Sequence, residues 1–471
     1  MLTYPGRIGR VAVLAAGVLG LIATLSLPAV AAGPTLSLAP KSGPPTTTVR
    51  VAVTGFEPAE VVGVAFDAST VVSATADSSG AVETSFMVPA SALPGAHPVT
   101  ATGGTSGLSA GAKFMVRTNW TQFHRDQVEN GYNPHENVLS ATNVGSLSVK
   151  WSYSMFTGTG FNLIASTPAL VNGVAYIGGE NGKIYALNAT TGALVWSHAV
   201  GGAVESSPAV ARGIVYAGSN DGTVYALKAS DGSVLWSYTT GGGVESSPSV
   251  AGGIAYVGSG DDNVYALDAT TGALVWSYTT GGPVDWSTAA ISKGIVYIGS
   301  EDDRLYALRA STGAKVWSRA TGDSIISTPA VAGGVVYVGS WDNKVYALKA
   351  SNGKVLWTYA TGGQIYSSPA VAGGVVYIGS RDHNVYALSA STGKELWSFQ
   401  TGWEVLSSPT VANGVVYVGS MDFSVYALDA ATGTELWSYE TGAQVSGIAP
   451  VVTNGLVYAG SWDGNLYAFG L

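Results

Sequence analysis

The chain has 471 residues, with 21 Lys and Arg against 30 Asp and Glu and a formal net charge of −9. An acidic chain of this kind is a poor candidate for binding a phosphate backbone, so we expect no nucleic-acid partner. Cysteine is absent, which excludes disulfides, thiol catalysis and thiolate metal sites. The 63 glycines and 24 tyrosines favour tightly turned sheet over helix.

Residues 1–31 have the pattern of a secretory signal peptide. Arg7 and Arg10 precede an apolar stretch from Val11 to Leu27, and residues 29–31 (Ala-Val-Ala) form a small-x-small cleavage site. The alternative is an uncleaved membrane anchor, because the stretch approaches the minimum spanning length. Pro28 and the small residues after it favour cleavage. We therefore expect a secreted, extracellular protein, free or held at the cell surface, without a membrane segment once the signal is removed.

Residues 34–117 predict a small β-sandwich. Short apolar runs alternate with turn residues, and the predicted strands cover residues 48–53, 61–66, 71–75, 82–88 and 113–116. The stretch Pro-Lys-Ser-Gly-Pro-Pro-Thr at 40–46, followed by Val-Ala-Val-Thr-Gly-Phe-Glu-Pro at 51–58, resembles bacterial immunoglobulin-like modules. That resemblance implies a spacer or an adhesive unit.

A single unit recurs after a lead-in segment at 118–148. Each repeat contains four short apolar runs separated by Gly, Asn, Asp or Thr-Gly turns, and each outer run carries a tryptophan eleven residues after a tyrosine, as in Tyr265 and Trp276. A period of about 40 residues with four strands per unit is typical of a β-propeller blade. The tryptophans are Trp151, Trp196, Trp236, Trp276, Trp317, Trp357, Trp397 and Trp437.

Counting these units predicts an all-β fold whose main body, residues 149–471, is an eight-bladed propeller of four-stranded antiparallel blades. Seven units are complete, and an eighth begins at Ser446 but stops before its tryptophan strand. The strand around Trp151 precedes the first complete unit. Pairing it with the last three strands completes the eighth blade and removes the exposed edges at the ends of the ring.

The repeated Tyr-Ala-Leu-x-Ala-x-x-Gly-x-x-x-Trp, seen at 265–276, resembles the tryptophan-docking motif of the pyrroloquinoline quinone (PQQ) propeller superfamily. The segment from Trp120 to Asn133 also resembles the lead-in of such propellers. The resemblance implies that each of the eight tryptophans wedges between neighbouring blades. Two departures of this chain from the family weaken any transfer of function. The dehydrogenases that it resembles carry a vicinal cysteine pair and long insertions, whereas this chain has no cysteine and nearly uniform repeats. The lipidated scaffold protein of outer-membrane assembly, which it also resembles, needs an N-terminal cysteine that this chain lacks.

A binding site must lie where the blades differ, because residues that every blade repeats are structural by default. The loops before the first strand and between the second and third strands of each blade are expected on one face of the ring. In the first loop the equivalent residues are Ala165, Glu205, Glu245, Trp286, Ile326, Tyr366, Leu406 and Gly447. In the second they are Glu180, Asn220, Gly260, Glu301, Trp341, Arg381, Met421 and Trp462, with His383, Trp403 and Phe423 nearby.

One arc of this face is acidic and the other aromatic, so it suits a flat or amphipathic ligand or a protein surface. Equally, these side chains could pack on neighbouring loops without any ligand. The candidate ligand-binding residues are Glu205, Glu245, Trp286, Trp341, Tyr366, Arg381, Trp403 and Trp462. The aspartates that recur once per blade, such as Asp261, are assigned to turns.

Three functions follow from this interpretation. The favoured one is a secreted, non-enzymatic binding or scaffold propeller for a protein, glycan or small ligand, with no catalytic residues, no metal and no cofactor. The second is a PQQ-dependent oxidoreductase, in which the quinone stacks on an aromatic side chain such as Trp286 and calcium is held by Glu205 or Glu245. The third is a structural module of the cell surface.

Overall fold

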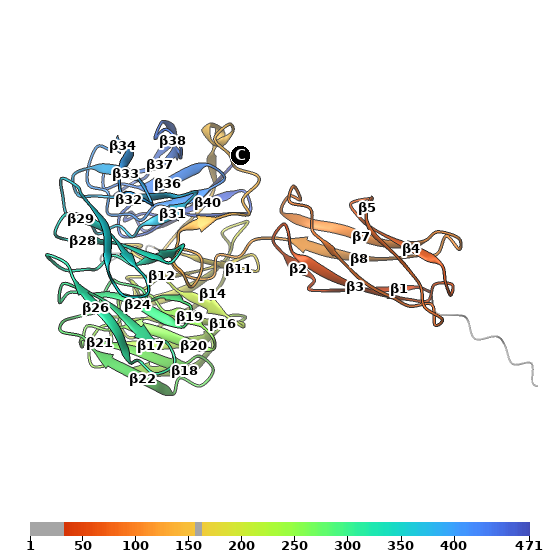
Figure 1. The fold of residues 1–471 in the computed structure, drawn as a ribbon, viewed down its shortest axis with the longest axis horizontal. Coiled ribbons are helices and arrows are strands. Elements are labelled where there is room, and N and C mark those ends of the chain that lie inside the picture. The colour runs from red at the N-terminus through yellow and green to blue at the C-terminus, as the bar shows by residue number, and fades with distance from the viewer. Residues whose placement is uncertain (1–32, 156–162) are drawn as a thin grey trace, which may run out of the picture.

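The computed structural model describes residues 33–155 and 163–471, so the predicted signal peptide lies outside the described residues. These residues form β-strands and one short 3-10 helix, η1 (Val144–Ser146). Two units follow each other along the chain, an N-terminal β-sandwich and a ring of blades (Figure 1). The all-β prediction is confirmed.

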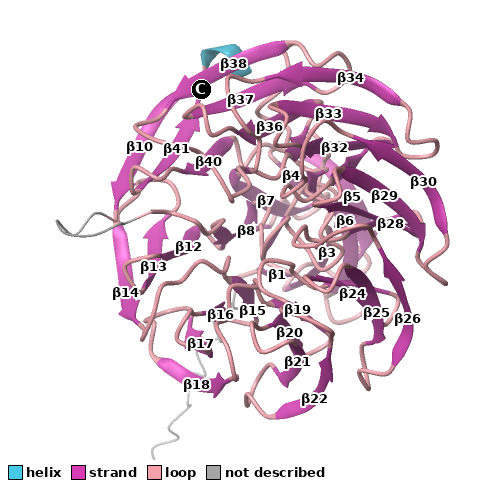
Figure 2. Ribbon diagram, turned by 90° about the vertical axis from the view of Figure 1, so that its left-hand side faces the viewer, coloured by secondary structure: helices cyan, strands magenta, loops and turns pink. Residues whose placement is uncertain are grey.

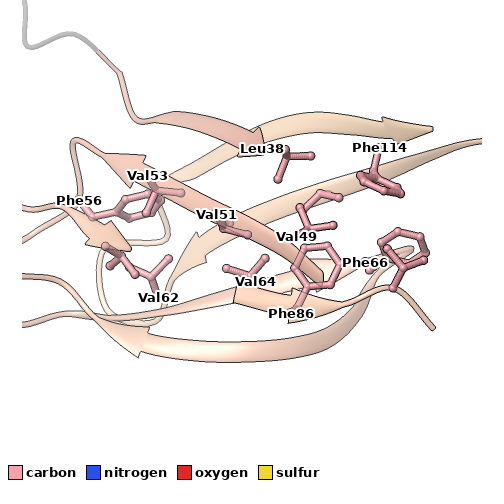
Figure 3. Close-up of a cluster of buried hydrophobic side chains, with 14 of the residues drawn as sticks. Leu38, Val49, Val51, Val53, Phe56, Val62, Val64, Phe66, Phe86 and Phe114 are labelled. Atoms are coloured by element: carbon pink, nitrogen blue, oxygen red, sulfur yellow. The ribbon is translucent and has the colours of Figure 1, made fainter. Parts of the chain in front are cut away.

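The N-terminal β-sandwich consists of a three-stranded sheet, β1-β3-β6, and a five-stranded sheet, β2-β8-β7-β4-β5. Alternate residues of both sheets turn inward and bury a single apolar core that includes Val51, Val64 and Phe114 (Figure 3). The strands are β1 (Thr35–Ala39), β2 (Ser42–Gly43), β3 (Thr48–Thr54), β4 (Val61–Phe66), β5 (Ser69–Thr75), β6 (Val82–Met87), β7 (Gly95–Gly103) and β8 (Ser109–Val116).

The sequence-based strand list for this unit was incomplete. It lacked β1, β2 and β7, although β7 pairs with both β4 and β8 in the five-stranded sheet. Pro98 lies inside β7, and proline in the middle of a strand argues against a central position because it cannot donate to the ladder. Strand β8 nevertheless pairs with β7 on both sides of Pro98, and β4 pairs with it from Val99 onward, so tertiary pairing outweighs the local signal.

The second unit is a closed ring of eight blades with four antiparallel strands each, as predicted (Figure 2). In the seventh blade the two-residue strand β9 (Tyr132–Asn133) adds in parallel to the innermost strand. The innermost strands are β11 (Ala169–Val171), β15 (Ala209–Ala211), β19 (Ser249–Ala251), β23 (Ala290–Ser292), β27 (Ala330–Ala332), β31 (Ala370–Ala372), β35 (Thr410–Ala412) and β39 (Val451–Thr453). The second strands are β12 (Val174–Gly179), β16 (Ile214–Gly218), β20 (Ile254–Gly258), β24 (Ile295–Ser300), β28 (Val335–Ser340), β32 (Val375–Gly379), β36 (Val415–Gly419) and β40 (Leu456–Gly460).

The third strands are β13 (Lys183–Asn188), β17 (Thr223–Lys228), β21 (Asn263–Asp268), β25 (Arg304–Arg309), β29 (Lys344–Lys349), β33 (Asn384–Ser389), β37 (Ser424–Asp429) and β41 (Asn465–Gly470). The outer strands are β14 (Leu194–Ala199), β18 (Val234–Thr239), β22 (Leu274–Thr279), β26 (Lys315–Ala320), β30 (Val355–Ala360), β34 (Glu395–Gln400), β38 (Glu435–Glu440) and β10 (Ser148–Ser154).

The ring is closed by β10, which precedes the first complete blade in sequence and forms the outer strand of the eighth. It pairs antiparallel with β41, placing Trp151 opposite Ala468. Closure therefore joins residues from the two ends of the propeller sequence and leaves no unpaired edge between its first and last blades.

The eight tryptophans occupy the seams between blades. Trp276 shows the repeated arrangement: its indole N–H donates to the Ala310 carbonyl of the next blade at 2.8 Å, and its ring lies against Gly313. A Cβ at Gly313 would stand 2.7 Å from that ring, and the φ of +71° also favours glycine. Trp151, Trp196, Trp236, Trp317, Trp357 and Trp397 repeat the contact, while Trp437 donates to the Leu147 carbonyl.

The recurring aspartates organise turns. The Asp261 side chain accepts hydrogen bonds from the Gly241 amide at 2.6 Å, from the Asn263 amide at 3.1 Å and from the Tyr265 hydroxyl at 2.6 Å. Each such aspartate thus links a turn of its own blade to the end of the preceding blade. Their recurrence is explained by structure, without a ligand.

The lead-in segment between residues 120 and 133 runs along the inside of the ring and hydrogen-bonds to the innermost strand of every blade in turn. Trp120 exchanges two backbone hydrogen bonds with Leu170 of the first blade, and the Asn133 amide donates to Val452 of the eighth. Its partners in the other six blades are Val210, Ser249, Val250, Ile291, Val331, Val371 and Val411. The segment is therefore an internal strap that obstructs the central channel.

The N-terminal β-sandwich is attached on the strap side of the ring. The Thr118 amide donates to Asn454, which lies in the turn between the first and second strands of the eighth blade. The Asn137 side chain donates to the carbonyls of Ala90 and Ala92 in the β-sandwich. Since the loops between the second and third strands lie at the opposite strand ends, they form the face of the ring away from the β-sandwich.

Candidate functional site

A cavity of about 360 Å³ occupies the channel mouth on the face away from the β-sandwich. Its wall combines the two loop types in which the blades differ with repeated hydroxyl residues and one residue of the strap, and its size lies in the range of small-molecule sites. The lining residues are Phe123, Ala165, Glu205, Ser207, Glu245, Ser247, Trp286, Thr288, Glu301, Ile326, Thr328, Trp341, Tyr366, Ser368, Leu406, Ser408, Ser446, Gly447 and Trp462.

Most of the candidate residues meet in this cavity. Six of the eight line it, namely Glu205, Glu245, Trp286, Trp341, Tyr366 and Trp462. Arg381 and Trp403 stand outside the lining; Trp403 is 48% exposed, and Arg381 is held by Glu404 at 3.0 Å and Gln364 at 2.8 Å. The structure thus brings together residues that are up to 257 positions apart in sequence, from 205 to 462.

The acidic wall consists of Glu205, Glu245 and Glu301, which come from the second, third and fourth blades. None of them forms an ion pair with a residue that the structure describes. Burial, together with the charges of Glu205, Asp285 and Glu301, raises the pKa of Glu245 to about 7. Burial also raises the pKa of Glu205 and, with the charge of Asp285, that of Glu301.

The aromatic part of the cavity wall consists of Trp286, Trp341, Tyr366 and Trp462. The rings of Trp341 and Tyr366 lie 4.9 Å apart at an angle of 30°, and the Arg381 guanidinium lies 5.5 Å from the Tyr366 ring centre. The indole nitrogens of Trp341 and Trp462 are shielded from solvent and have no acceptor among the described residues. Flat apolar surfaces of this kind suit a ligand that carries a ring.

A ring of hydroxyl groups forms the neck of the cavity. Within it, the hydroxyl oxygen of one blade accepts the backbone N–H of the preceding blade, as Ser207 does from Thr167 and Ser247 does from Ser207, at 2.9 and 2.8 Å. Thr328, Ser368 and Ser408 repeat the contact at 2.9 Å. The hydroxyls therefore join the innermost strands and present small polar groups to the cavity.

The internal strap supplies part of the cavity lining through Phe123. The Phe123 ring stacks on the buried His124 ring at 4.3 Å, and burial lowers the His124 pKa to about 4. Glu129 is also buried, and its carboxylate accepts a hydrogen bond from the Gln122 amide at 2.7 Å. These contacts make the channel mouth a pocket that ends at the strap.

Sequence reasoning did not select several lining residues. Glu301 occupies one of the two variable loops, so comparison of the repeats carried a signal for it that was not used. The neck hydroxyls recur in most blades and were therefore treated as structural. Phe123 belongs to the lead-in segment, and nothing in the repeat pattern places that segment inside the ring.

These features define an eight-bladed β-propeller with tryptophan-docked blades and a pocket at its channel mouth. The chain belongs to the PQQ-like repeat family described as outer membrane protein assembly factor BamB, which matches residues 135–283, 260–368 and 361–471. The predicted resemblance to this superfamily is confirmed.

Solved structures show the same fold. BamB from Moraxella catarrhalis is 20% identical and superposes with a TM-score of 0.61 over 69% of this chain and 100% of that one. The quinohemoprotein alcohol dehydrogenase ADHIIG from Pseudomonas putida HK5 is 19% identical, with a TM-score of 0.66 over 75% of this chain and 80% of that one.

Curated relatives match only in part. The dehydrogenase subunit of alcohol dehydrogenase (quinone) from Gluconobacter oxydans is 36% identical over 80 residues, which is 17% of this chain and 10% of that protein. Quinohemoprotein alcohol dehydrogenase ADH-IIG from Pseudomonas putida is 35% identical over 80 residues, or 17% of this chain and 11% of that protein. The chain thus spans about a tenth of the length of these relatives.

The pocket fits PQQ by size but not by charge. PQQ is a flat quinone that bears several carboxylates, whereas the lining contains three glutamates and no Lys, Arg or His among the described residues. Arg381, which lies over the Tyr366 ring outside the lining, is already engaged by Glu404. In the described part of the chain, no three His, Cys, Asp or Glu side chains gather in a metal-binding arrangement. The residues present therefore do not form a suitable site for an anionic quinone.

No helix among the described residues is both long and apolar enough to cross a membrane.

Proposed function

We propose that this protein is a non-enzymatic binding propeller whose ligand occupies the channel-mouth cavity. One observation carries the proposal: eleven of the sixteen positions at which the blades differ line a single cavity of about 360 Å³, namely all eight of the first loop and Glu301, Trp341 and Trp462 of the second. A propeller with a purely structural role would need no such convergence, so we rank the structural module below the binding protein.

The oxidoreductase is the second candidate, because partial relatives are quinone-dependent alcohol dehydrogenases. The acidic lining argues against it, since the wall that would face the quinone carboxylates carries Glu205, Glu245 and Glu301. Like charges brought together in a partly buried cavity weaken binding.

We further propose that the protein is exported and that the N-terminal β-sandwich is an immunoglobulin-like spacer. The predicted signal peptide supports export. The attachment of the β-sandwich to the strap side of the ring supports a spacer role, because it leaves the cavity mouth unobstructed on the other face.

Adding PQQ and calcium to the purified protein separates the two candidates. Absorbance, melting temperature and dye-linked alcohol or sugar oxidation are followed together. We expect no saturable change in any of them. Saturable binding accompanied by turnover would overturn the binding propeller in favour of the oxidoreductase.

Capture of extracellular components on the immobilised protein tests the binding role directly. We expect the double variant Trp341→Ala, Trp462→Ala to capture at least tenfold less ligand than the wild-type protein, because both indoles line the cavity. Trp403→Ala is the matched control, since Trp403 stands outside the lining. Equal capture by the wild-type protein, the double variant and the Trp403→Ala control would show that the cavity is not the binding site.

A further inference from the structure

The acidic side of the cavity lacks counter-charges, and this imbalance identifies the kind of ligand. Among the described residues, the Glu205 side chain accepts a hydrogen bond only from the Asn220 amide, at 2.9 Å, and Glu245 makes no hydrogen bond or ion pair. The lining offers these carboxylates no basic side chain of a described residue. Carboxylates that are half-buried and unpaired are expensive unless a cation joins them.

The aromatic side of the cavity favours the same sign of charge. The faces of Trp and Tyr rings carry negative electrostatic potential, so they attract cations in addition to offering apolar contact. The protein itself uses this attraction once beside the cavity, where the Arg381 guanidinium lies over the Tyr366 ring. Both walls of the pocket therefore oppose an anion and favour a cation with an apolar body.

A bare metal ion fits this arrangement less well than an organic cation. The three glutamates stand on three different blades, and the described residues provide no group of three metal-binding side chains. The cavity volume of about 360 Å³ and its aromatic wall also exceed what a single ion needs. An ammonium group attached to a ring would satisfy the acids and cover the indoles together.

We propose that the channel-mouth cavity binds a small organic ammonium ion, with its charge beside Glu205, Glu245 and Glu301 and its apolar body against Trp286, Trp341 and Tyr366. This inference rests on the proposed binding function and specifies its ligand class. It also gives a physical reason why a member of this family would not retain an anionic quinone.

Three probes with one ring and different charges test the inference by calorimetry at about pH 8, where Glu245 is ionised. Tryptamine is cationic, 3-methylindole is neutral and indole-3-propionate is anionic. We expect tryptamine to bind at least tenfold more tightly than 3-methylindole, and indole-3-propionate to bind more weakly than either. Ethylamine, which has the charge but no ring, should bind more weakly than tryptamine.

Paired variants locate the effect. We expect Glu245→Gln to weaken tryptamine binding about tenfold, which corresponds to about 1.4 kcal/mol, and to leave 3-methylindole unchanged. Glu440→Gln removes an equal charge from the exposed outer strand β38 and should change neither. Melting temperatures of both variants verify that they fold.

The outcomes separate this inference from the proposed function. If all three indoles bind equally and Trp341→Ala weakens them equally, the cavity is a binding site but the cation preference is wrong. If tryptamine does not bind, or binds equally to Glu245→Gln, the ammonium ligand is likewise rejected. The binding function itself is then judged by the capture experiment with the double tryptophan variant.

Discussion

The blade seams and the channel mouth are built by the same repeat but follow opposite rules. At the seams, one contact recurs around the propeller. An indole N–H donates to an alanine carbonyl of the next blade and the indole packs on a glycine, as Trp276 does with Ala310 and Gly313. At the mouth, equivalent positions hold an acid in one blade and an indole in another, as Glu245 and Trp286 do.

This difference separates stability from recognition within one fold. The residues of a seam contact must fit the adjacent blade, so they cannot change without opening the seam. The loops at the mouth face the channel, so their side chains can differ in charge and size while the strands behind them stay unchanged. The comparison predicts large losses of stability at the seams and small ones, or even gains, at the mouth.

Removing a seam tryptophan should have the largest effect. We expect Trp276→Ala to lower the free energy of unfolding by about 3–5 kcal/mol, because it empties a buried site and removes one of the two donors to the Ala310 carbonyl, which keeps only the Tyr256 hydroxyl at 3.1 Å. Urea unfolding followed by circular dichroism measures the change. Trp403→Ala, at a side chain that is 48% exposed, should cost about 0.5 kcal/mol or less. Equal losses in the two variants would contradict the division between seam and mouth.

Adding a methyl group at a seam glycine should have an intermediate effect. A Cβ at Gly272 would stand 2.6 Å from the Trp236 ring, whereas a Cβ at Gly253 would meet nothing within 4 Å. Both residues have positive φ, at +74° and +84°, so both alanine variants carry backbone strain. We expect Gly272→Ala to lose about 1–3 kcal/mol more than Gly253→Ala in thermal unfolding. A similar loss in both would mean that backbone strain alone requires the glycine.

Neutralising an acid at the mouth should have the smallest effect and the opposite sign. The folded-state pKa of Glu245, about 7, lies above its usual value of 4.5, so the folded protein holds this proton more tightly than the unfolded chain. Its contribution to stability is therefore present at low pH and is lost as pH rises toward and through 7. We expect Glu245→Gln to raise the free energy of unfolding by about 1 kcal/mol at about pH 8, a figure reduced for solvent screening because the side chain is partly exposed.

The same variant should have no stabilising effect at about pH 4, where Glu245 is protonated in the folded protein and largely protonated in the unfolded chain. Unfolding midpoints at the two pH values, with Glu440→Gln as the control, measure the difference. A pH-independent gain would show that the Glu245 charge is not the cause.

Sequence periodicity was sufficient to predict the propeller because every blade repeats the same pattern of residues. The interval between Trp236 and Trp276, the tyrosine eleven residues before each, and the missing last strand together determined the number of blades and the closing strand. The β-sandwich was harder, since its strands have no repeat to average over. Pro98 concealed β7, whose position depends on pairing with β4 and β8.

The candidate site was partly predictable for the same reason. Comparison of equivalent positions selected Glu205, Glu245 and four aromatic residues that line the cavity. It also selected Trp403 and Arg381, because a loop position does not determine whether a side chain turns toward the channel. The direction of each side chain depends on contacts such as that between Arg381 and Glu404.

The sequence by itself determined the blade number and the face on which the blades differ, because these follow from local patterns repeated along the chain. Its resemblance to the PQQ propeller superfamily implied the tryptophan docking. Only the tertiary structure decided where the strap runs and what the variable residues enclose. The path of residues 120–133 along all eight innermost strands is set by hydrogen bonds to residues far away in sequence. That path brings Phe123 to the cavity lining, and ring closure places Trp462 in the same cavity as Glu205, so a pocket forms that no single repeat encodes.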